Sequence, residues 1–360
     1  MFGNFNNVAE YILLPDSIFI CLKQNFINNW FEEMKKIKWC ILGTGGISRK
    51  FAEALKAVDN SELYAVGSRT RENAESFARE FNVRKAYGNY ENAAEDPDVD
   101  VIYIGTPHTL HCENTLMCLD KGKNVLCEKP LSINGNEVRK MIAKAKEKNL
   151  FFMEALWTRF LPNIIKAKEL IDSNEIGKIK FLNSCFSVKS SYEPGHRQFN
   201  RELGGGSLLD IGIYNVFLTL LLLGKPMDFV AMAGIGNTEV DNTCSFIFKY
   251  DDDTLAVMYS SFVAQSNSIA EIHGETGKIL LPHMFHCPND IVLTRPDGEE
   301  KIIHFEFKSN GYNFEAEEVV KCLQTGKIQS DLMSWNDSLE LIDMLDSIRK
   351  KCGIVYPGRD

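Results

Sequence analysis

The sequence predicts an α/β protein in two parts: a doubly wound parallel sheet, then an α+β part built on a mostly antiparallel, open-faced sheet. Three observations lead to this prediction. Short apolar runs alternate with segments of helical periodicity as far as Met153. The first apolar run ends in a glycine turn that opens a helix. After Trp157 the pattern changes to many short strand-like runs separated by turn residues.

The first part alternates strands with helices of the length that parallel βαβ units require. Its predicted strands are almost wholly apolar, which is typical of a parallel sheet covered on both faces, and the right-handed crossover rule gives a doubly wound sheet. The strands are expected at residues 37–42, 63–66, 101–104, 125–127 and 151–153. Helices are expected around residues 47–58, 74–81, 116–119 and 138–145, where apolar residues recur three and four apart.

The second part begins with one helix, roughly residues 163–173. Turn signals such as Asp251-Asp252-Asp253 and Pro296-Asp297-Gly298 suit hairpins, so its sheet is expected to be mostly antiparallel. A strongly apolar helix is expected at residues 208–223, and two more helices at 314–323 and 335–350. The expected strands are residues 179–188, 229–235, 243–250, 254–262, 269–273, 278–281, 291–294 and 301–305.

The composition argues against several classes of function. A net charge of -9 and the lack of a dense Lys/Arg run argue against a nucleic-acid-binding surface. The ten cysteines form no C-x-x-C pair, and no ligand pattern completes His108 and His111, so we expect reduced thiols in a cytoplasmic protein and no metal site. The longest apolar run, residues 216–223, is far shorter than the ~20 residues that cross a membrane, so no membrane segment is expected.

The segment Gly43-Thr44-Gly45-Gly46-Ile47-Ser48 follows a predicted strand and opens a predicted helix. Its glycine spacing is a weak signal alone, but this position at the start of a βαβ unit is typical of a dinucleotide-binding turn. Gly43 permits the tight turn, Gly45 lets the backbone approach a pyrophosphate, and Ser48 is small enough for helix–strand packing. Because N–H groups at a helix start attract phosphates, we expect NAD or NADP to bind on this turn.

The end of the second strand helps to choose between these cofactors. NAD-binding domains typically place Asp or Glu there for the ribose 2′-hydroxyl. Here the segment is Val66-Gly67-Ser68-Arg69-Thr70-Arg71, which contains no acid. Ser68, Arg69 and Arg71 can instead hold a 2′-phosphate, because a guanidinium matches phosphate in geometry and charge. We therefore expect NADP, with NAD as the alternative; the other interpretation of these residues is a solvated helix start.

Three further clusters suggest chemistry. Gly105-Thr106-Pro107-His108-x-x-His111 and Cys127-Glu128-Lys129-Pro130 follow predicted strands, and open α/β sheets bind ligands at the carboxyl ends of their strands. Gly204-Gly205-Gly206 precedes Asp210 and Tyr214, which lie four apart and so share a helix face. A carboxylate and a phenol inside an apolar helix are costly unless they have partners. Each cluster alone is a weak signal, because solvated pairs and core tyrosines are common.

Taken together, four motifs resemble those of the Gfo/Idh/MocA oxidoreductases, in the same order over residues 36–352. They are Gly-Thr-Gly-Gly-Ile, Thr-Pro-x-x-x-His, Glu-Lys-Pro and Gly-Gly-Gly-x-Leu-x-Asp-x-Gly. Within that family, residues 153–162 and Tyr214 are similar to the dimeric dihydrodiol dehydrogenase-like branch, whereas many members carry histidine at the position of Tyr214. That branch oxidises trans-dihydrodiols of arenes and some sugars with NADP.

The resemblance implies hydride transfer between nicotinamide and a CH–OH or carbonyl carbon of a sugar, cyclic polyol or trans-dihydrodiol. It places Lys129 beside the nicotinamide and the reacting oxygen, with Asp210 and Tyr214 facing it from the second domain. A free tyrosine has a pKa near ~10, and a nearby ammonium lowers that value. We therefore expect Lys129 to tune Tyr214 and Asp210 to orient the pair.

Further residues receive roles from the same resemblance. His111 is expected to position substrate or cofactor, Trp157 and Phe186 to supply apolar walls unless they are core residues, and Lys129-Pro130 to be a cis peptide. The loop at residues 190–201 is expected to set specificity. The expected cofactor-binding residues are Gly43, Thr44, Gly45, Gly46, Ile47, Ser68, Arg69, Arg71, Thr106, Pro107, His111, Glu128 and Lys129. The expected catalytic residues are Lys129, Asp210 and Tyr214, and the expected substrate contacts are Lys129, Trp157, Phe186, Asp210 and Tyr214.

The length of 360 residues suits two domains. We expect a Rossmann dinucleotide-binding domain at residues 34–156 and a substrate-binding and dimerisation domain at residues 157–360, with the open sheet face around residues 243–262 pairing in a twofold homodimer. Residues 1–33 lack the features of a signal peptide, so we expect Met34 to be the native start. The alternative is a genuine extension that packs as a short helix.

The alternative function is a cofactor-binding regulator or interaction protein of the same fold without turnover. Such a protein is expected to have lost catalytic groups. Lys129, Asp210 and Tyr214 are all present, which favours the enzyme.

Overall fold

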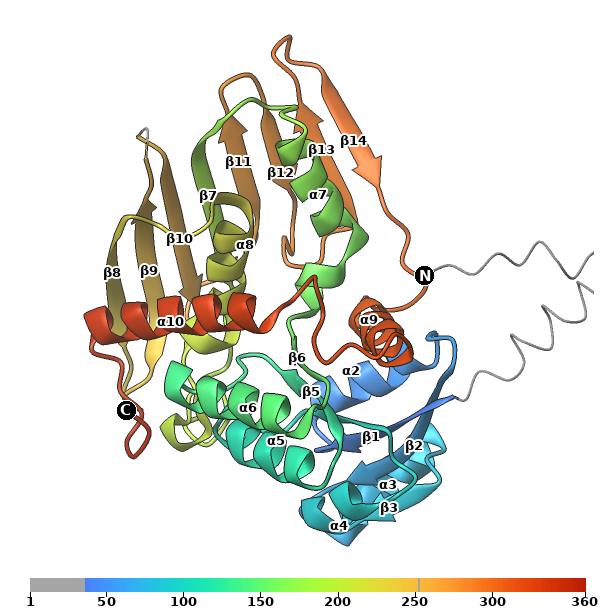
Figure 1. Ribbon diagram of the computed structural model, residues 1–360. Helices are drawn as coiled ribbons and strands as arrows, with labels where there is room; N and C mark the ends of the chain where they lie inside the picture. The colour runs from blue at the N-terminus through green and yellow to red at the C-terminus, as the bar shows by residue number, and fades with distance from the viewer. Residues whose placement is uncertain (1–35, 252) are drawn as a thin grey trace, which may run out of the picture.

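The computed structural model describes residues 36–251 and 253–360. The predictions about residues 1–33 and a start at Met34 lie outside the described residues. Within these ranges the chain forms two sheets with helices packed against them (Figure 1).

The first sheet has six parallel strands in the order β3-β2-β1-β4-β5-β6, the doubly wound arrangement that was expected. The strand order reverses between β1 and β4, and such sheets bind ligands outside the carboxyl ends at that point. The strands are β1 (Ile37–Leu42), β2 (Ser61–Gly67), β3 (Lys85–Tyr87), β4 (Val101–Ile104), β5 (Asn124–Glu128) and β6 (Phe152–Ala155). The helices are α2 (Gly46–Leu55), α3 (Arg71–Phe81), α4 (Tyr90–Glu95), α5 (His111–Asp120) and α6 (Gly135–Lys148).

Strands β1, β4 and β5 are buried almost throughout, which explains their apolar sequences. β3 and α4 have no counterpart among the predicted elements. β3 is a half-buried edge strand of three residues, and α4 has only six, so neither carries enough periodicity to be recognised.

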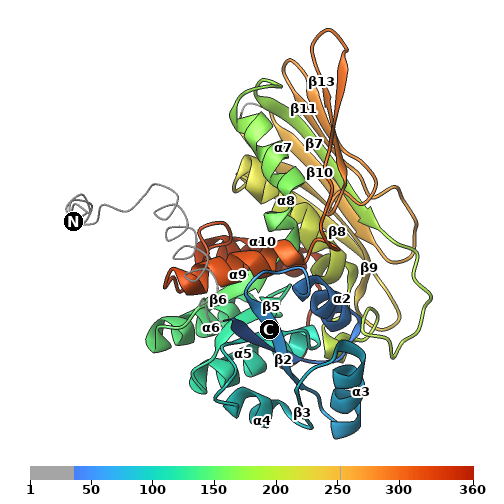
Figure 2. The ribbon, with the colours of Figure 1, turned by 90° about the vertical axis from the view of Figure 1, so that its right-hand side faces the viewer.

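The second sheet has eight strands in the order β14-β13-β12-β11-β7-β10-β9-β8. Its neighbouring strands are antiparallel except for the parallel pair β7 and β10, which confirms a mostly antiparallel sheet. Helices α7 and α8 lie on one side of this sheet, and the opposite side is open (Figure 2). The strands are β7 (Ile179–Ser187), β8 (Asp228–Ile235), β9 (Asp241–Lys249), β10 (Leu255–Ser261), β11 (Ala270–Gly274), β12 (Lys278–Leu281), β13 (Asp290–Thr294) and β14 (Glu300–His304).

Helix α7 is Pro162–Asp172, and the expected apolar helix is split in two. A π-helical turn, Leu208–Gly212, precedes the regular helix α8 (Ile213–Leu223). In the described part of the chain, the stretch Arg201–Leu223 is long and apolar enough to cross a membrane. However, 78% of its apolar 18-residue segment is buried inside the protein. Its apolar composition therefore matches its buried position, where α8 packs on β7 and β10 of the second sheet and on α10.

The last two helices return to the first sheet (Figure 1). Helix α9 (Asn313–Gln324) packs on α2, and α10 (Trp335–Cys352) packs on α6 and β8. The backbone N–H of Phe152 in β6 donates to the carbonyl of Ile328 at 3.0 Å, and Trp335 Nε1 donates to the Phe152 carbonyl at 2.9 Å. The end of the chain thus holds the two sheets together. The domain boundary between residues 156 and 157 stays a prediction.

Candidate active site

The glycine turn lies between β1 and α2, at the carboxyl edge of the first sheet. Gly43 has a φ of +97°, and a Cβ there would lie 2.8 Å from the carbonyl oxygen of Gly105. Gly45 caps α2 without a side-chain bond, and the first turn of α2 contains no acid. The N–H groups of that turn have no acceptor within the helix, and a Cβ on Gly45 or Gly46 would meet nothing within 4 Å. This open, positively polarised backbone fits a diphosphate.

Ser48 stands where the dinucleotide motif has its third glycine, and it is fully buried. A Cβ on Gly105 would lie 2.5 Å from the Ser48 hydroxyl, so helix α2 approaches the end of β4 closely here. The expectation that Ser48 is small enough for this packing is confirmed.

The residues expected to hold a 2′-phosphate lie just after β2. Ser68 is buried with its hydroxyl 3.4 Å from that of Thr44, so this end of β2 adjoins the glycine turn. Arg69 is exposed, whereas Arg71 Nε donates to Glu75 at 2.7 Å along α3. Contacts of Ser68, Arg69 and Arg71 with a 2′-phosphate stay predictions.

The loop after β4 carries Thr106, Pro107 and His111. His111 is fully enclosed, with its ring nitrogens 2.8 Å from the Pro130 carbonyl oxygen and 2.9 Å from that of Thr106. It therefore braces this loop against the loop after β5, and its expected role in positioning substrate or cofactor stays a prediction. Direct cofactor contacts of Thr106 and Pro107 stay predictions.

Glu128 ends β5, and its carboxylate is also engaged within the protein. Its oxygens accept hydrogen bonds from the Tyr103 hydroxyl at 2.6 Å and from the backbone N–H of Lys129 at 3.1 Å. Burial raises the pKa of this carboxyl. The Glu128 side chain thus fixes the backbone of Lys129, and a contact of Glu128 with the cofactor stays a prediction.

Lys129 and Asp210 meet where the end of β5 faces the π-helical turn. Lys129 Nζ lies 2.6 Å from the Asp210 carbonyl oxygen and 3.4 Å from Oδ1, and the Lys129–Pro130 bond is cis, as expected. Asp210 Oδ1 also accepts a hydrogen bond from Arg197 at 2.9 Å, and His108 Nε2 lies 3.9 Å away. Burial alone would raise the pKa of the Asp210 carboxyl, but the charges of Lys129 and Arg197 hold it well below its ordinary value. Asp210 is therefore ionised at neutral pH and orients the ammonium group.

Tyr214 lies one turn further along, in α8, and faces the same lysine. Lys129 Nζ is 5.0 Å from the centre of the Tyr214 ring, and the hydroxyl accepts a hydrogen bond from Trp157 Nε1 at 2.9 Å. Burial raises the pKa of this hydroxyl well above its ordinary value, and the carboxyls of Glu128 and Asp210 act in the same direction. The expectation that Lys129 lowers the pKa of Tyr214 is therefore wrong, because burial and the two carboxyls outweigh the ammonium.

Aromatic rings surround Tyr214 on its other sides. The Phe186 ring lies 5.6 Å from the Tyr214 ring and stacks on His286 at 4.2 Å. Trp157 stacks on Tyr312, also at 4.2 Å. Trp157 and Phe186, which were expected to line the site with apolar surface, therefore both lie beside the Tyr214 side chain.

Two residues at the site have no counterpart among the predicted ones. His286, from the loop between β12 and β13, lies 5.0 Å from the Tyr214 ring, and its Nδ1 is buried without a partner. Burial lowers the pKa of His286 to about 3. Arg197, on Asp210, comes from the loop expected to set specificity. A single histidine or arginine in a loop carries no periodic signal, so only the fold reveals that either belongs to the site.

An exposed dinucleotide turn, a buried Lys–Asp pair and a phenol thus meet at the carboxyl edge of a doubly wound sheet. This combination defines an NAD(P)-dependent oxidoreductase, because the turn suits the cofactor and the side chains suit proton transfer beside it. Among residues 36–251 and 253–360 there is no group of three or more His, Cys, Asp or Glu side chains arranged to hold a metal ion.

The chain belongs to the Gfo/Idh/MocA family of oxidoreductases. The model of the oxidoreductase family with an NAD-binding Rossmann fold matches residues 37–156, and that of the Gfo/Idh/MocA C-terminal domain matches residues 164–280. The regulator without turnover, considered as the alternative, is set aside because the curated relatives are dehydrogenases.

The similarity to known proteins covers most of the chain. Trans-1,2-dihydrobenzene-1,2-diol dehydrogenase from Xenopus laevis is 39% identical over 330 residues, 89% of this chain and 99% of that protein. The enzyme of that name from Homo sapiens is 34% identical over 331 residues, with 89% and 98% covered. A 3-ketoreductase from Actinomadura kijaniata, solved with NADP and TDP-benzene, shares the fold with a TM-score of 0.80 at 24% identity, covering 88% of this chain and 98% of that one.

The buried imidazole of His286 predicts a stability that depends on pH. The folded state keeps this ring neutral down to about pH 3, whereas the unfolded chain takes up a proton below pH ~6.5. Its contribution therefore lowers the unfolding free energy as pH falls from ~6.5 towards 3. His286→Phe keeps a ring against Phe186 and removes the titration, so urea unfolding between pH 6.5 and 4 should show a shallower pH dependence.

The matched control is His283→Gln, because His283 is exposed in the same loop. That variant should keep the wild-type slope. An unchanged slope in His286→Phe would show that the imidazole is not held neutral.

Proposed function

We propose that this chain is an NADP-dependent dehydrogenase or reductase that acts on a ring carrying neighbouring hydroxyl groups, such as a trans-dihydrodiol or a sugar. The observation that carries the proposal is the contact between Lys129 and Asp210 beside Tyr214, at the edge of the dinucleotide-binding sheet. The names of the dihydrodiol dehydrogenase relatives support the substrate class.

The side chains divide the proton chemistry among them. When bound, the nicotinamide supplies or accepts the hydride. Lys129 Nζ delivers a proton to the reacting oxygen in reduction and receives it in oxidation, while Asp210 stays ionised and orients the nitrogen. Tyr214 keeps its proton, because the pKa of its hydroxyl is raised, and therefore donates a hydrogen bond to the substrate oxygen.

The surroundings of these groups suit a flat or cyclic substrate. Trp157, Phe186 and His286 present rings near the phenol, and apolar ring faces pack well against them. Arg197 adds hydrogen-bond donors from a side chain that is half exposed, and hydroxyl groups are suitable acceptors for it. The substrate is therefore proposed to combine an apolar ring face with hydroxyl groups at its edge.

The cofactor is proposed to be NADP, with NAD as the weaker alternative. The segment after β2 holds Ser68 and the exposed Arg69 where NAD-binding domains carry an acid. A 2′-phosphate gains a charged partner there, whereas a 2′-hydroxyl finds no carboxylate.

A homodimer is proposed to form through the open face of the second sheet. One row of paired residues crosses all eight strands on this face: Val230, Ile247, Val257, Asn183, Glu271, Leu280, Val292 and Ile302. Val230 is 55% exposed and Ile302 67%, and Met232 on the next row is 79% exposed. A face this apolar is suited to pairing with a second copy about a twofold axis.

The proposed compartment is the cytoplasm. The cysteines of the described residues are free thiols, and all but Cys287 and Cys352 are buried. Free thiols are typical of a reducing compartment.

The activity is tested by nicotinamide absorbance with trans-dihydrobenzenediol and a panel of sugars, using NADP and NAD in parallel. We expect turnover with a higher kcat/KM for NADP. Lys129→Met should lower kcat by at least about a hundredfold and Tyr214→Phe by about tenfold or more, because each removes a group beside the reacting oxygen. The Kd for NADPH, measured by fluorescence titration, should change little for Tyr214→Phe, since the dinucleotide turn is untouched.

The matched control is Lys140→Met, which removes an exposed ammonium group from α6 and should keep wild-type turnover. Wild-type turnover in Lys129→Met would rule out the assigned chemistry. Cofactor binding without any turnover across the panel would instead rule out the substrate class.

The dimer is tested by sedimentation at micromolar concentration. Ile247→Glu places a charge within the exposed row, between Val230 and Val257, so it should convert a wild-type dimer into a monomer. Lys140→Glu, a charge change on the exposed surface of α6, should leave the dimer intact. A monomeric wild-type profile would contradict the proposal.

A further inference from the structure

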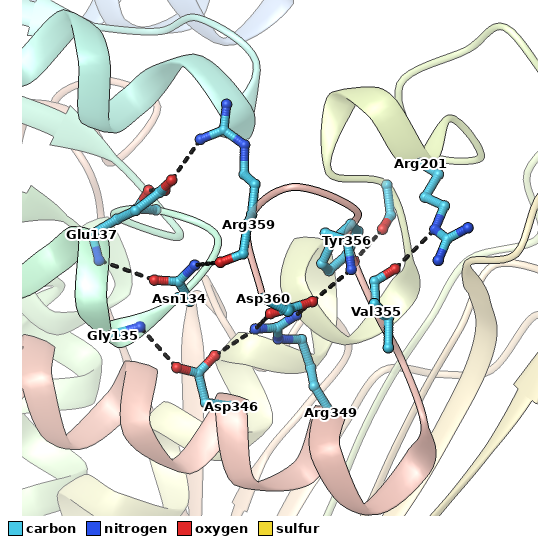
Figure 3. Close-up of polar contacts among 12 residues, drawn as sticks. Asn134, Gly135, Glu137, Arg201, Asp346, Arg349, Val355, Tyr356, Arg359 and Asp360 are labelled. Atoms are coloured by element: carbon cyan, nitrogen blue, oxygen red, sulfur yellow. Dashed lines mark hydrogen bonds and ion pairs between the residues drawn. The ribbon is translucent and has the colours of Figure 1, made fainter.

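The segment that follows α10, residues 353–360, runs between the start of α6 and the Gly204-Gly205-Gly206 loop (Figure 3). In the middle of this segment, Tyr356 is 2% exposed, and its hydroxyl donates to the Gly205 carbonyl at 2.5 Å. Arg201 Nε, from the short helix before the glycines, donates to the Val355 carbonyl at 2.8 Å. The segment therefore holds the loop that leads into Asp210.

The last residues of the same segment contact the start of α6, which belongs to the first part of the chain. Arg359 pairs with Glu137 at 2.6 Å, and its carbonyl accepts a hydrogen bond from Asn134 Nδ2 at 2.7 Å. Asn134 caps α6 by accepting from the backbone N–H of Glu137 at 2.9 Å. Because α6 begins at Gly135, only a few residues after Lys129, this end contacts the loop that carries the lysine.

An ion network around the buried Arg349 holds the segment against α10. The carboxylate of Asp360 accepts hydrogen bonds from Arg349 at 2.8 Å and 3.2 Å and from the Tyr356 backbone N–H at 2.6 Å. Arg349 is 3% exposed, pairs with Asp346 at 2.7 Å, and lies over the Tyr356 ring at 5.2 Å. Because the Arg349 guanidinium is buried, losing either carboxylate leaves part of its charge unpaired, and this favours the observed geometry of the segment.

The three glycines are enclosed by a different neighbour at each position. A Cβ on Gly204 would lie 2.6 Å from Ile133, and one on Gly205 would lie 2.7 Å from the Arg197 carbonyl. A Cβ on Gly206 would collide with Asp241 and come within 3.2 Å of the Tyr356 hydroxyl. The loop thus has little room to adjust, and a change at Tyr356 is transmitted along it.

We propose that Tyr356 is a positioning residue: with residues 357–360 it holds the Gly205 carbonyl relative to α6, and so sets Asp210 against Lys129. The proposal rests on the roles proposed above for Lys129 and Asp210. Tyr356 itself touches neither side chain. It acts through five residues of backbone, and a misplacement of ~1 Å in a catalytic group lowers turnover by up to about a hundredfold.

The test is Tyr356→Phe, which removes the bond to Gly205 and keeps the ring over Arg349. We expect kcat to fall by about tenfold to a hundredfold, while the Kd for NADPH stays at the wild-type value because the glycine turn is remote. The acid limb of kcat/KM should move to higher pH, since Asp210 loses part of its contact with Lys129 and Arg197. Val355→Ala, which trims an exposed side chain on the same segment, should behave as wild type.

A double-mutant cycle with Asp210→Asn separates positioning from general destabilisation. If Tyr356 acts through Asp210, Tyr356→Phe should lower the single-turnover rate much less in the Asp210→Asn background than in the wild type. Equal losses in both backgrounds, or an unchanged kcat in Tyr356→Phe, would overturn the proposal. Full activity in Asp210→Asn alone would instead refute the catalytic role on which it rests. Arg359→Ala, which releases the other end, gives a second route to the same loss if Tyr356→Phe fails to fold.

Discussion

The contact between Lys129 and Asp210 is the interaction on which the site depends. The lysine follows a strand of the first sheet and the aspartate lies in the π-helical turn of the second part, so the contact exists only when both parts are in place. Both side chains are largely buried, with 12% and 5% exposed. A buried charge without a partner is strongly unfavourable, which makes each residue a constraint on the position of the other.

The two imidazoles and the phenol near this pair are neutral, because burial disfavours their charged forms. His108 and His286 both have a pKa of about 3, and burial raises the pKa of Tyr214. Neither imidazole nor the phenol therefore adds a charge beside Lys129, Asp210 and Arg197. In the mechanism proposed above, the substrate oxygen meets one oriented ammonium group and one phenol among aromatic rings that are in place before the substrate binds.

Sequence patterns predict the elements that depend on neighbouring residues, such as strands, helices and tight turns. Both sheets, the strands at Val101–Ile104 and Lys278–Leu281, and the dinucleotide turn follow from periodicity and glycine spacing. Features set by contacts distant in sequence were not predicted. They include the π-helical turn at Asp210, His286 from another loop, and the Tyr356 contact 151 residues from Gly205. The raised pKa of Tyr214 belongs with these features, because it depends on burial, whereas the family resemblance implies only that Lys129 lies nearby.

The central claim is that proton transfer takes place at Lys129 Nζ, between the two parts of the chain. The most direct test is a crystal structure of the enzyme with NADP and an unreactive analogue of a trans-dihydrodiol. The account predicts the reacting oxygen within about 3.2 Å of Lys129 Nζ and of the Tyr214 hydroxyl. An analogue bound in order with that oxygen beyond hydrogen-bond reach of Lys129 would contradict it.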